Sequence, residues 1–244
     1  MPLRSRAKLG LRPRASRGFT IIESALAILI IGLTTQGVLV GQQLITNARV
    51  RSLMAQQNAV EAAFYSFQDR YRAFPGDYAA ASANLDCGAS ACLNGNGNGR
   101  IEPGPAGRLH EDILAWHHLT ASGLLDGEYR MFNSTVASPA FDNTPTNAFG
   151  GYLQIVSDSV WGYGSNTAVR HNVKTGDLIP VAILAEVDRK IDDGLPGSGR
   201  LQFSTYAGLA DAPTVSSCMT AASPAASWNI ASGEGNCGAA TLLY

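Results

Sequence analysis

Acidic residues are absent from the first eighteen positions of this chain, and basic residues are sparse in the remainder. Residues 1–18 contain six arginines and lysines, whereas the following residues carry 12 basic and 19 acidic side chains, a net charge of −7. A protein that binds nucleic acid through its phosphates needs a basic patch or stripe. The acidic remainder has none, so the sequence does not indicate a nucleic-acid partner.

Motifs of the common enzyme classes are also missing. The sequence contains no GxSxG, no HExxH, no Walker A loop and no dinucleotide-binding fingerprint. The acidic residues Glu102, Glu111, Asp192 and Asp193 form no recognisable catalytic pair. The adjacent Asp192 and Asp193 offer ligands for a cation, but a solvated helix end is the simpler explanation. We therefore predict a protein that is not an enzyme.

Cysteine is scarce, with Cys87 and Cys92 forming one close pair and Cys218 and Cys237 a later one. Neither spacing is the CxxC of a zinc ribbon or a redox site. An even number of cysteines in a chain with an export signal favours disulfides. Four cysteines allow three connectivities, of which we favour pairing within each local pair.

No charged residue occurs between Ser24 and Ala48, where the sequence is largely apolar. About 20 such residues cross a bilayer core as a helix, and this run is too long for the apolar region of an ordinary signal peptide. It continues without proline, which predicts one helix from about Phe19 to Tyr71. Residues 19–42 form its membrane-spanning part in this interpretation. Glycines 32, 37 and 41 permit close helix contact or local melting, or are simply tolerated.

The second half of this helix is amphipathic. Apolar side chains recur there at helical spacing, and polar ones occupy the other faces. The apolar positions are Val50, Leu53, Met54, Val60, Phe64, Phe67 and Tyr71. This face is suited to packing against a globular domain.

Glu23 interrupts the apolar segment near its start. An ionised carboxylate within a membrane costs roughly 3 kcal/mol on insertion scales, so it needs a partner. If the chain is cut between Gly18 and Phe19, the new α-amino group lies one helical turn from Glu23 and neutralises it. The amine of a neighbouring copy offers the same partner.

Residues 17–23, Arg-Gly-Phe-Thr-Ile-Ile-Glu, closely resemble the processing site of type IV prepilins and type II secretion pseudopilins. The resemblance covers about the first fifth of the chain. It implies that a prepilin peptidase cuts after Gly18 and methylates Phe19. It also implies that Glu23 pairs with a neighbour's amine during assembly of a type IV pilus (a fimbrium), a secretion pseudopilus or a DNA-uptake filament.

The resemblance further implies a domain organisation and a place in the cell envelope. Residues 1–18 are a cleaved basic leader, residues 19–73 the long helix and residues 74–244 a globular head. The helix sits in the bacterial inner membrane with the head in the periplasm, and then enters an extracytoplasmic filament. The implied partners are copies of this chain, other pilins or pseudopilins, the peptidase, the assembly platform and membrane lipid.

An Asn/Gly-rich segment, residues 94–102, imitates the first half of an EF-hand calcium loop. Oxygen-bearing side chains alternate along it, and the candidate ligands are Asn94, Asn96, Asn98, Arg100, Glu102 and, from further along the chain, Glu111. The leading positions are neutral asparagines, and Pro105 replaces the usual bidentate glutamate. Asp86 is another possible carboxylate. The alternative is a flexible loop closed by Cys87 and Cys92, so calcium remains one of two interpretations.

The sequence of the rest of the head predicts a pilin-like α+β fold, in which the long N-terminal α-helix packs on a small antiparallel β-sheet. Helices are expected at 111–124 and 179–191, and short strands at 129–132, 152–157, 160–163 and 200–206. His117 and His118 are adjacent and diverge by ~100° on a helix, so they are expected as surface or boundary residues rather than as ligands of one metal. The tail from Ala207 gives no clear pattern.

A membrane-tethered binding protein with an uncleaved signal anchor is the alternative function. Such a protein keeps residues 1–18, whereas a filament subunit loses them. Processing therefore discriminates between the two hypotheses.

Overall fold

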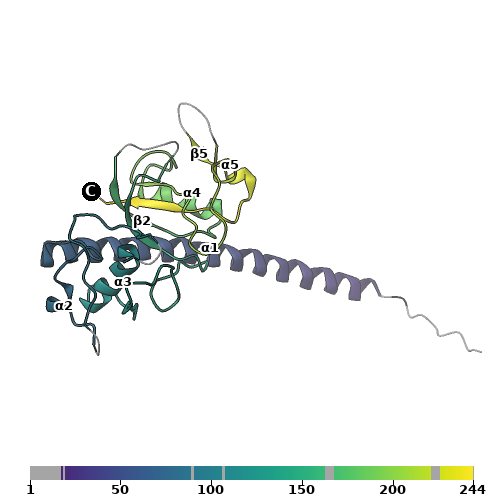
Figure 1. Ribbon diagram of the computed structural model, residues 1–244. Coiled ribbons are helices and arrows are strands. Elements are labelled where there is room, and N and C mark those ends of the chain that lie inside the picture. The colour runs from purple at the N-terminus through teal and green to yellow at the C-terminus, as the bar shows by residue number, and fades with distance from the viewer. Residues whose placement is uncertain are drawn as a thin grey trace, which may run out of the picture. The chain divides into compact units, whose positions relative to one another are not determined.

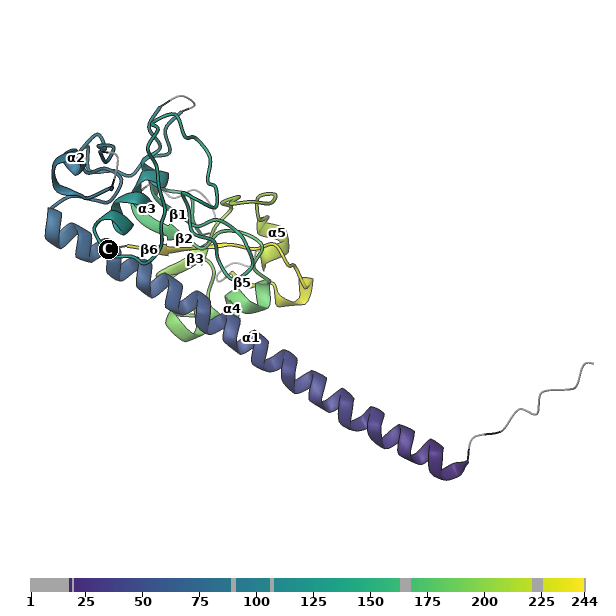
Figure 2. The same ribbon diagram turned by 90° about the horizontal axis from the view of Figure 1, so that it is seen from below.

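The computed structural model describes residues 18, 20–88, 91–105, 108–162, 168–220 and 226–243. The chain divides into two units, Met1–Ile45 and Thr46–Tyr244, which are described separately. The predicted leader up to residue 17 and Phe19 lie outside the described residues. Figures 1 and 2 show the ribbon in two views.

Helix α1 extends over Ile21–Tyr71. Thr20 caps its start, because the Glu23 amide donates to the Thr20 hydroxyl oxygen at 3.3 Å. The helix ends just before Arg72, which has a positive φ of 55°, and before the Pro75-Gly76 turn. The predicted end of the helix at Tyr71 is confirmed.

Four strands form the main sheet, all antiparallel, in the order β1-β2-β6-β3. Their bounds are Gln154–Asp158 for β1, Arg170–Lys174 for β2, Leu201–Phe203 for β3 and Ala239–Leu242 for β6. The register places Ile155, Val173, Thr241 and Leu201 in one row across the sheet. Since side chains alternate along a strand, these four lie on the same face.

The second half of α1 packs on that face (Figure 2). Val50 and Leu53 join one core cluster with β3 and β6, while Phe64 and Phe67 join another with β1 and β2. Helices α3 (Glu111–Ala121) and α4 (Val181–Ile191) complete these two clusters. A buried hydrogen bond from the Thr241 hydroxyl to Gln57 Oε1 at 3.0 Å links α1 to the central strand β6. The predicted α+β fold is confirmed.

Smaller elements connect this core. They are helices α2 (Ala81–Asn84) and α5 (Val215–Cys218), strands β4 (Met219–Thr220) and β5 (Ser227–Trp228), and the 3-10 helix η1 (Ile230–Ser232). Strands β4 and β5 pair as a separate two-stranded sheet.

The predicted strands need correction. The first, at 129–132, is a loop held by single hydrogen bonds, such as Arg130 N to Asp142 O at 2.8 Å. Residues 160–162 of the third are not a strand either, and Tyr163 lies outside the described residues. The second and fourth correspond to β1 and β3. Strands β2 and β6 were not predicted, although β6 lies inside the sheet.

Candidate functional site

The first half of α1 exposes a continuous apolar surface. Its large side chains, including Ile22, Leu33 and Leu44, are all more than half exposed. In length and composition the helix is sufficient to cross a membrane, and none of its most apolar 18-residue window is buried. A Cβ atom added at Gly32, Gly37 or Gly41 would meet nothing within 4 Å.

Glu23 lies in the first turn of α1, where a carboxylate interacts favourably with the helix dipole. Its backbone amide is capped by Thr20, but within the described part of the chain its carboxylate has no hydrogen bond or ion pair. Gly18 is exposed. Because Phe19 lies outside the described residues, the pairing of its amine with Glu23 stays a prediction.

The Asn/Gly loop, residues 94–102, is ordered by its own asparagines. The side-chain oxygen of Asn94 accepts from Ser82 N at 2.8 Å, that of Asn96 from Asn98 N at 2.9 Å, and that of Asn98 from Arg100 N at 2.8 Å. The last two contacts join residues two positions apart and are of the kind that shapes tight turns, whereas the first ties the loop to helix α2.

Two buried carboxylates lie inside this loop. Asp77, which was not among the predicted ligands, accepts from Asn98 N at 2.9 Å and Gly99 N at 2.8 Å. Glu111, a predicted ligand, accepts from Asn96 N at 2.9 Å and Glu102 N at 3.3 Å.

The loop thus directs backbone N–H groups at both acids and satisfies one lone pair on each oxygen. The remaining lone pairs are compatible with a cation, as are Glu102 and the asparagine oxygens. Asp86 is engaged elsewhere, accepting from Gly88 N at 2.9 Å. The calcium interpretation stays a prediction, with Asp77 as an additional candidate ligand.

Burial determines the charge state of this cluster. Desolvation raises the pKa of Glu111 to about 7, and the nearby charges of Asp77 and Glu102 add to the rise, against the two amide hydrogen bonds. Only 1% of Glu111 is exposed. The carboxylate is therefore poised to change its charge near neutral pH.

His118 fixes the turn that carries Asp77. Gly76 N donates to His118 Nδ1 at 3.0 Å, and His118 Nε2 lies 2.9 Å from the carbonyl oxygen of Leu93. Burial lowers its pKa to about 4, so it is a neutral imidazole that accepts at Nδ1 and donates at Nε2.

His117 is buried as well, with Met131 N donating to its Nδ1 at 3.2 Å. The prediction that these histidines are surface or boundary residues was wrong, because both rings are buried and form hydrogen bonds with backbone groups inside the head.

Close backbone contacts explain the glycines of this region. A Cβ atom on Gly95 would lie 2.2 Å from Gly76 O, and one on Gly76 would lie 2.2 Å from Glu111 O. Only glycine allows the loop, the Pro75-Gly76-Asp77 turn and α3 to approach so closely.

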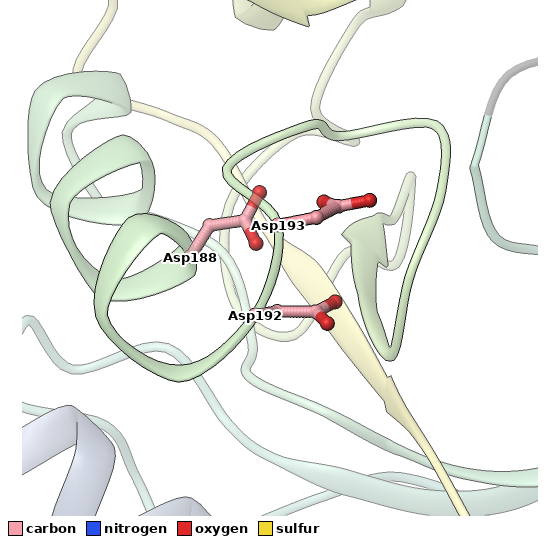
Figure 3. A group of neighbouring side chains, drawn as sticks. All are labelled: Asp188, Asp192 and Asp193. Carbon is pink, nitrogen blue, oxygen red and sulfur yellow. The ribbon is translucent and has the colours of Figure 1, made fainter.

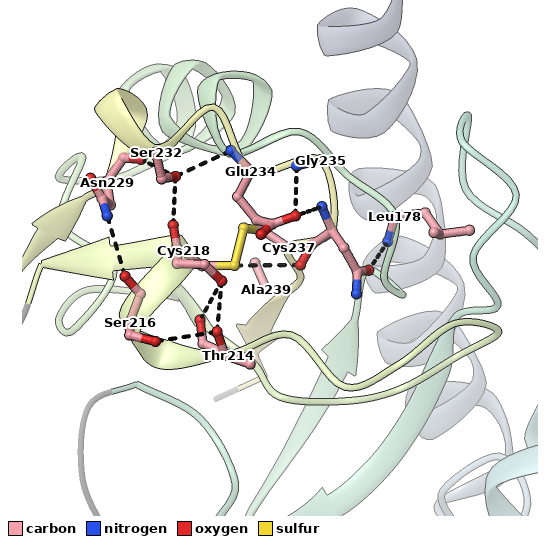
Figure 4. The surroundings of a disulfide bond; sticks show 12 residues. Leu178, Thr214, Ser216, Cys218, Asn229, Ser232, Glu234, Gly235, Cys237 and Ala239 are labelled. Carbon is pink, nitrogen blue, oxygen red and sulfur yellow. Dashed lines mark hydrogen bonds between the residues drawn. A yellow bond between two sulfur atoms is a disulfide. The ribbon is translucent and has the colours of Figure 1, made fainter.

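Both predicted disulfides are present. Cys87 and Cys92 are joined with Cα atoms 5.3 Å apart, and Cys218 and Cys237 with Cα atoms 5.7 Å apart. Figure 4 shows the second bond between α5 and the segment leading into β6. There Ser232 Oγ donates to Ser217 O at 2.7 Å, so hydrogen bonds support the covalent link.

Three aspartates gather at the end of α4 (Figure 3), with ligand atoms of Asp188, Asp192 and Asp193 within 4.8 Å of one another. The buried Asp188 accepts from Trp228 Nε1 at 2.7 Å, and burial raises its pKa to about 6. Asp192 accepts from Leu201 N at 2.8 Å. These contacts give the cluster a structural role in joining α4 to its neighbours.

No protein-family model matches the chain, and no curated protein or solved structure matches it either.

Proposed function

We propose that this protein is a structural subunit, a pilin or pseudopilin, of a type IV pilus or type II secretion-like filament. The observation that carries the proposal is the exposed apolar first half of α1, in which Glu23, near the start, is the one charged side chain. Five residues before that carboxylate stands the exposed Gly18, where the resemblance places the cleavage. A soluble protein would not leave such a surface without a partner.

The mechanism follows from the chemistry of this helix. In the membrane, lipid covers the apolar side chains between Ser24 and Ala48. Cleavage after Gly18 frees the amine of Phe19, and Glu23 of a neighbouring copy attracts that charge. The apolar helices then exchange lipid contacts for contacts with one another, and the packed helices hold the filament together without covalent links.

The partners in this proposal are other copies of the chain, related pilins or pseudopilins, a prepilin peptidase and an inner-membrane assembly platform. The head, residues 74–244, occupies the periplasmic side before assembly and the filament surface afterwards. Its disulfides are consistent with an oxidising compartment.

The decisive experiment is intact mass measurement and N-terminal sequencing of the chain expressed with and without a prepilin peptidase. We expect a peptidase-dependent N-terminus at Phe19 that carries one additional methyl group. A Gly18→Val variant is the matched control and should keep Met1. If the wild-type chain also keeps Met1 in the presence of an active peptidase, the tethered binding protein becomes the better explanation.

A further inference from the structure

Two neighbouring hollows mark the surface of the head around the loop 127–146. One has a volume of about 340 Å³ and the other about 390 Å³, and they share Glu128 and Tyr129 as lining residues. Each is within the size range of small-ligand sites in proteins. We call the pair the Glu128–Tyr129 groove.

Each hollow has an exposed aromatic ring. Phe132 lines the smaller one and is 45% exposed, and Phe141 lines the larger one and is 86% exposed. Each exposed ring offers an apolar face on which a ligand can stack. Neither ring lies on the apolar half of α1, so filament assembly through that helix does not account for them.

The backbone holds this groove in shape. Arg130 N donates to Asp142 O at 2.8 Å, which ties the segments that carry the two rings. The Thr120 hydroxyl of α3 donates to Tyr129 O at 3.2 Å, and the His117 ring packs edge-on against Phe132 at 5.2 Å. A site supported in this way loses little entropy on binding.

The polar groups of the groove are mainly oxygen acceptors. Asp142 has an exposed carboxylate with no partner in the described part of the chain, and Thr120 adds a hydroxyl. The charge of Glu128 is offset by Arg130, whose Nη2 lies 3.1 Å from Glu128 Oε2. Among the described lining residues the cation is Arg130, and its pairing with Glu128 disfavours recognition of a phosphate or another anion.

We propose that the Glu128–Tyr129 groove binds an oligosaccharide. The CH face of a sugar ring stacks on an aromatic side chain, while its hydroxyls donate to carboxylates and to the oxygen of Thr120, whose own proton is used inside the head. The two hollows share Glu128 and Tyr129 and each is lined by one phenylalanine, so we assign one sugar-binding position to each hollow. A compact organic ammonium ion would instead need several rings around a single position.

The test is glycan binding by the full chain, kept in a zwitterionic detergent because alkyl glycosides would compete. A glycan array with neutral, amino and acidic oligosaccharides identifies a ligand, and saturation-transfer NMR with that oligosaccharide measures the affinity. We expect Phe132→Ala/Phe141→Ala to weaken binding at least tenfold and Asp142→Asn to weaken it severalfold.

The matched control is Leu209→Ala/Ile230→Ala, which removes two exposed apolar side chains elsewhere on the head and should leave binding unchanged. If the double phenylalanine variant does not fold by circular dichroism, Phe141→Ala alone carries the test, because its ring is almost fully exposed.

Three results would overturn the proposal. They are no glycan retained by the wild type, equal affinity in the phenylalanine variants, or a change in self-association of the chain in place of sugar binding. None of these results depends on cleavage after Gly18, so failure here is distinct from failure of the filament proposal.

Discussion

At the scale of single residues, Glu111 and His118 respond to pH in opposite directions. Glu111 has its pKa raised by burial to about 7, so between pH 4.5 and 7 the folded chain holds a proton that the unfolded chain has lost. Its contribution to stability therefore falls as pH rises through this range, by up to roughly 3 kcal/mol. Replacing Glu111 with Gln removes this pH-dependent decrease in the free energy of unfolding.

We expect Glu111→Gln to make the unfolding free energy rise more steeply with pH between 4.5 and 7 than in the wild type. One amide hydrogen bond to the loop is also lost, which lowers stability at pH 5 by about 1 kcal/mol. Urea unfolding at several pH values measures both effects. Glu128→Gln, at an exposed position, serves as control, and an unchanged pH slope in Glu111→Gln would contradict the prediction.

His118 gives the complementary prediction. Burial lowers its pKa to about 4, so between pH 6.5 and 4 the unfolded chain binds the extra proton and stability decreases as pH falls. In His118→Gln this acid-induced loss should disappear, while Gly76 N or Leu93 O loses its partner and baseline stability drops by about 1–3 kcal/mol. A double variant with Glu111→Gln should have a pH slope between those of the two single variants, because the two contributions have opposite signs. A slope outside that interval in unfolding titrations would refute this account.

The site was only partly predictable at this scale. Glu111 and the asparagines were selected because alternating oxygens and glycines form a local pattern. Asp77 lies seventeen residues before Asn94, and no local spacing connects them. The position of His118 was predicted wrongly because histidine occurs both at surfaces and in cores. Only the fold shows that Gly76 N and Leu93 O require a hydrogen-bond partner there.

At the scale of elements, the Asn/Gly loop provides the calcium prediction. At neutral pH its enclosed acids Asp77 and Glu111 repel each other, and a divalent cation would relieve this repulsion. We expect calcium at ten times its dissociation constant to stabilise the chain by about 1.4 kcal/mol. The effect should be larger at pH 7.5 than at pH 5, where Glu111 is protonated.

Thermal unfolding with calcium, with magnesium and with EDTA measures this effect, and Asp77→Asn should reduce it. Equal melting temperatures with calcium and EDTA at pH 7.5 would show that the hydrogen bonds alone order the loop.

Helices were easier to predict than strands. The pattern of Ile179, Ile183, Val187 and Ile191 repeats over several turns, and α4 ends at Ile191 as expected. Strand β6 is only four residues, Ala-Ala-Thr-Leu, all of them buried. A short strand buried on both faces has no alternation of polar and apolar residues, so the sequence did not identify it.

At the scale of the whole molecule, we expect a substitution at Glu23 to affect filament assembly but not leader cleavage. A Glu23→Gln variant should still be cleaved after Gly18 but should form at least tenfold fewer filaments, because its neutral amide does not attract the neighbouring amine. Sheared-filament yield relative to total processed protein measures this. Asp69→Asn, on the exposed surface of the same helix, is the control. Normal filament yield in Glu23→Gln would count against the proposed assembly step.

The position of β6 also has a consequence for how the head is made. Strands β2 and β3 pair with β6 and not with each other, yet β6 follows both in the chain. A ribosome delivers the N-terminal part first, so the earlier strands wait with unpaired edges until residues 239–242 arrive. Such long-range pairing is slow and leaves these edges open to aggregation. A head interrupted before residue 239 should therefore remain a substrate for chaperones and proteases, which restricts assembly to completed chains.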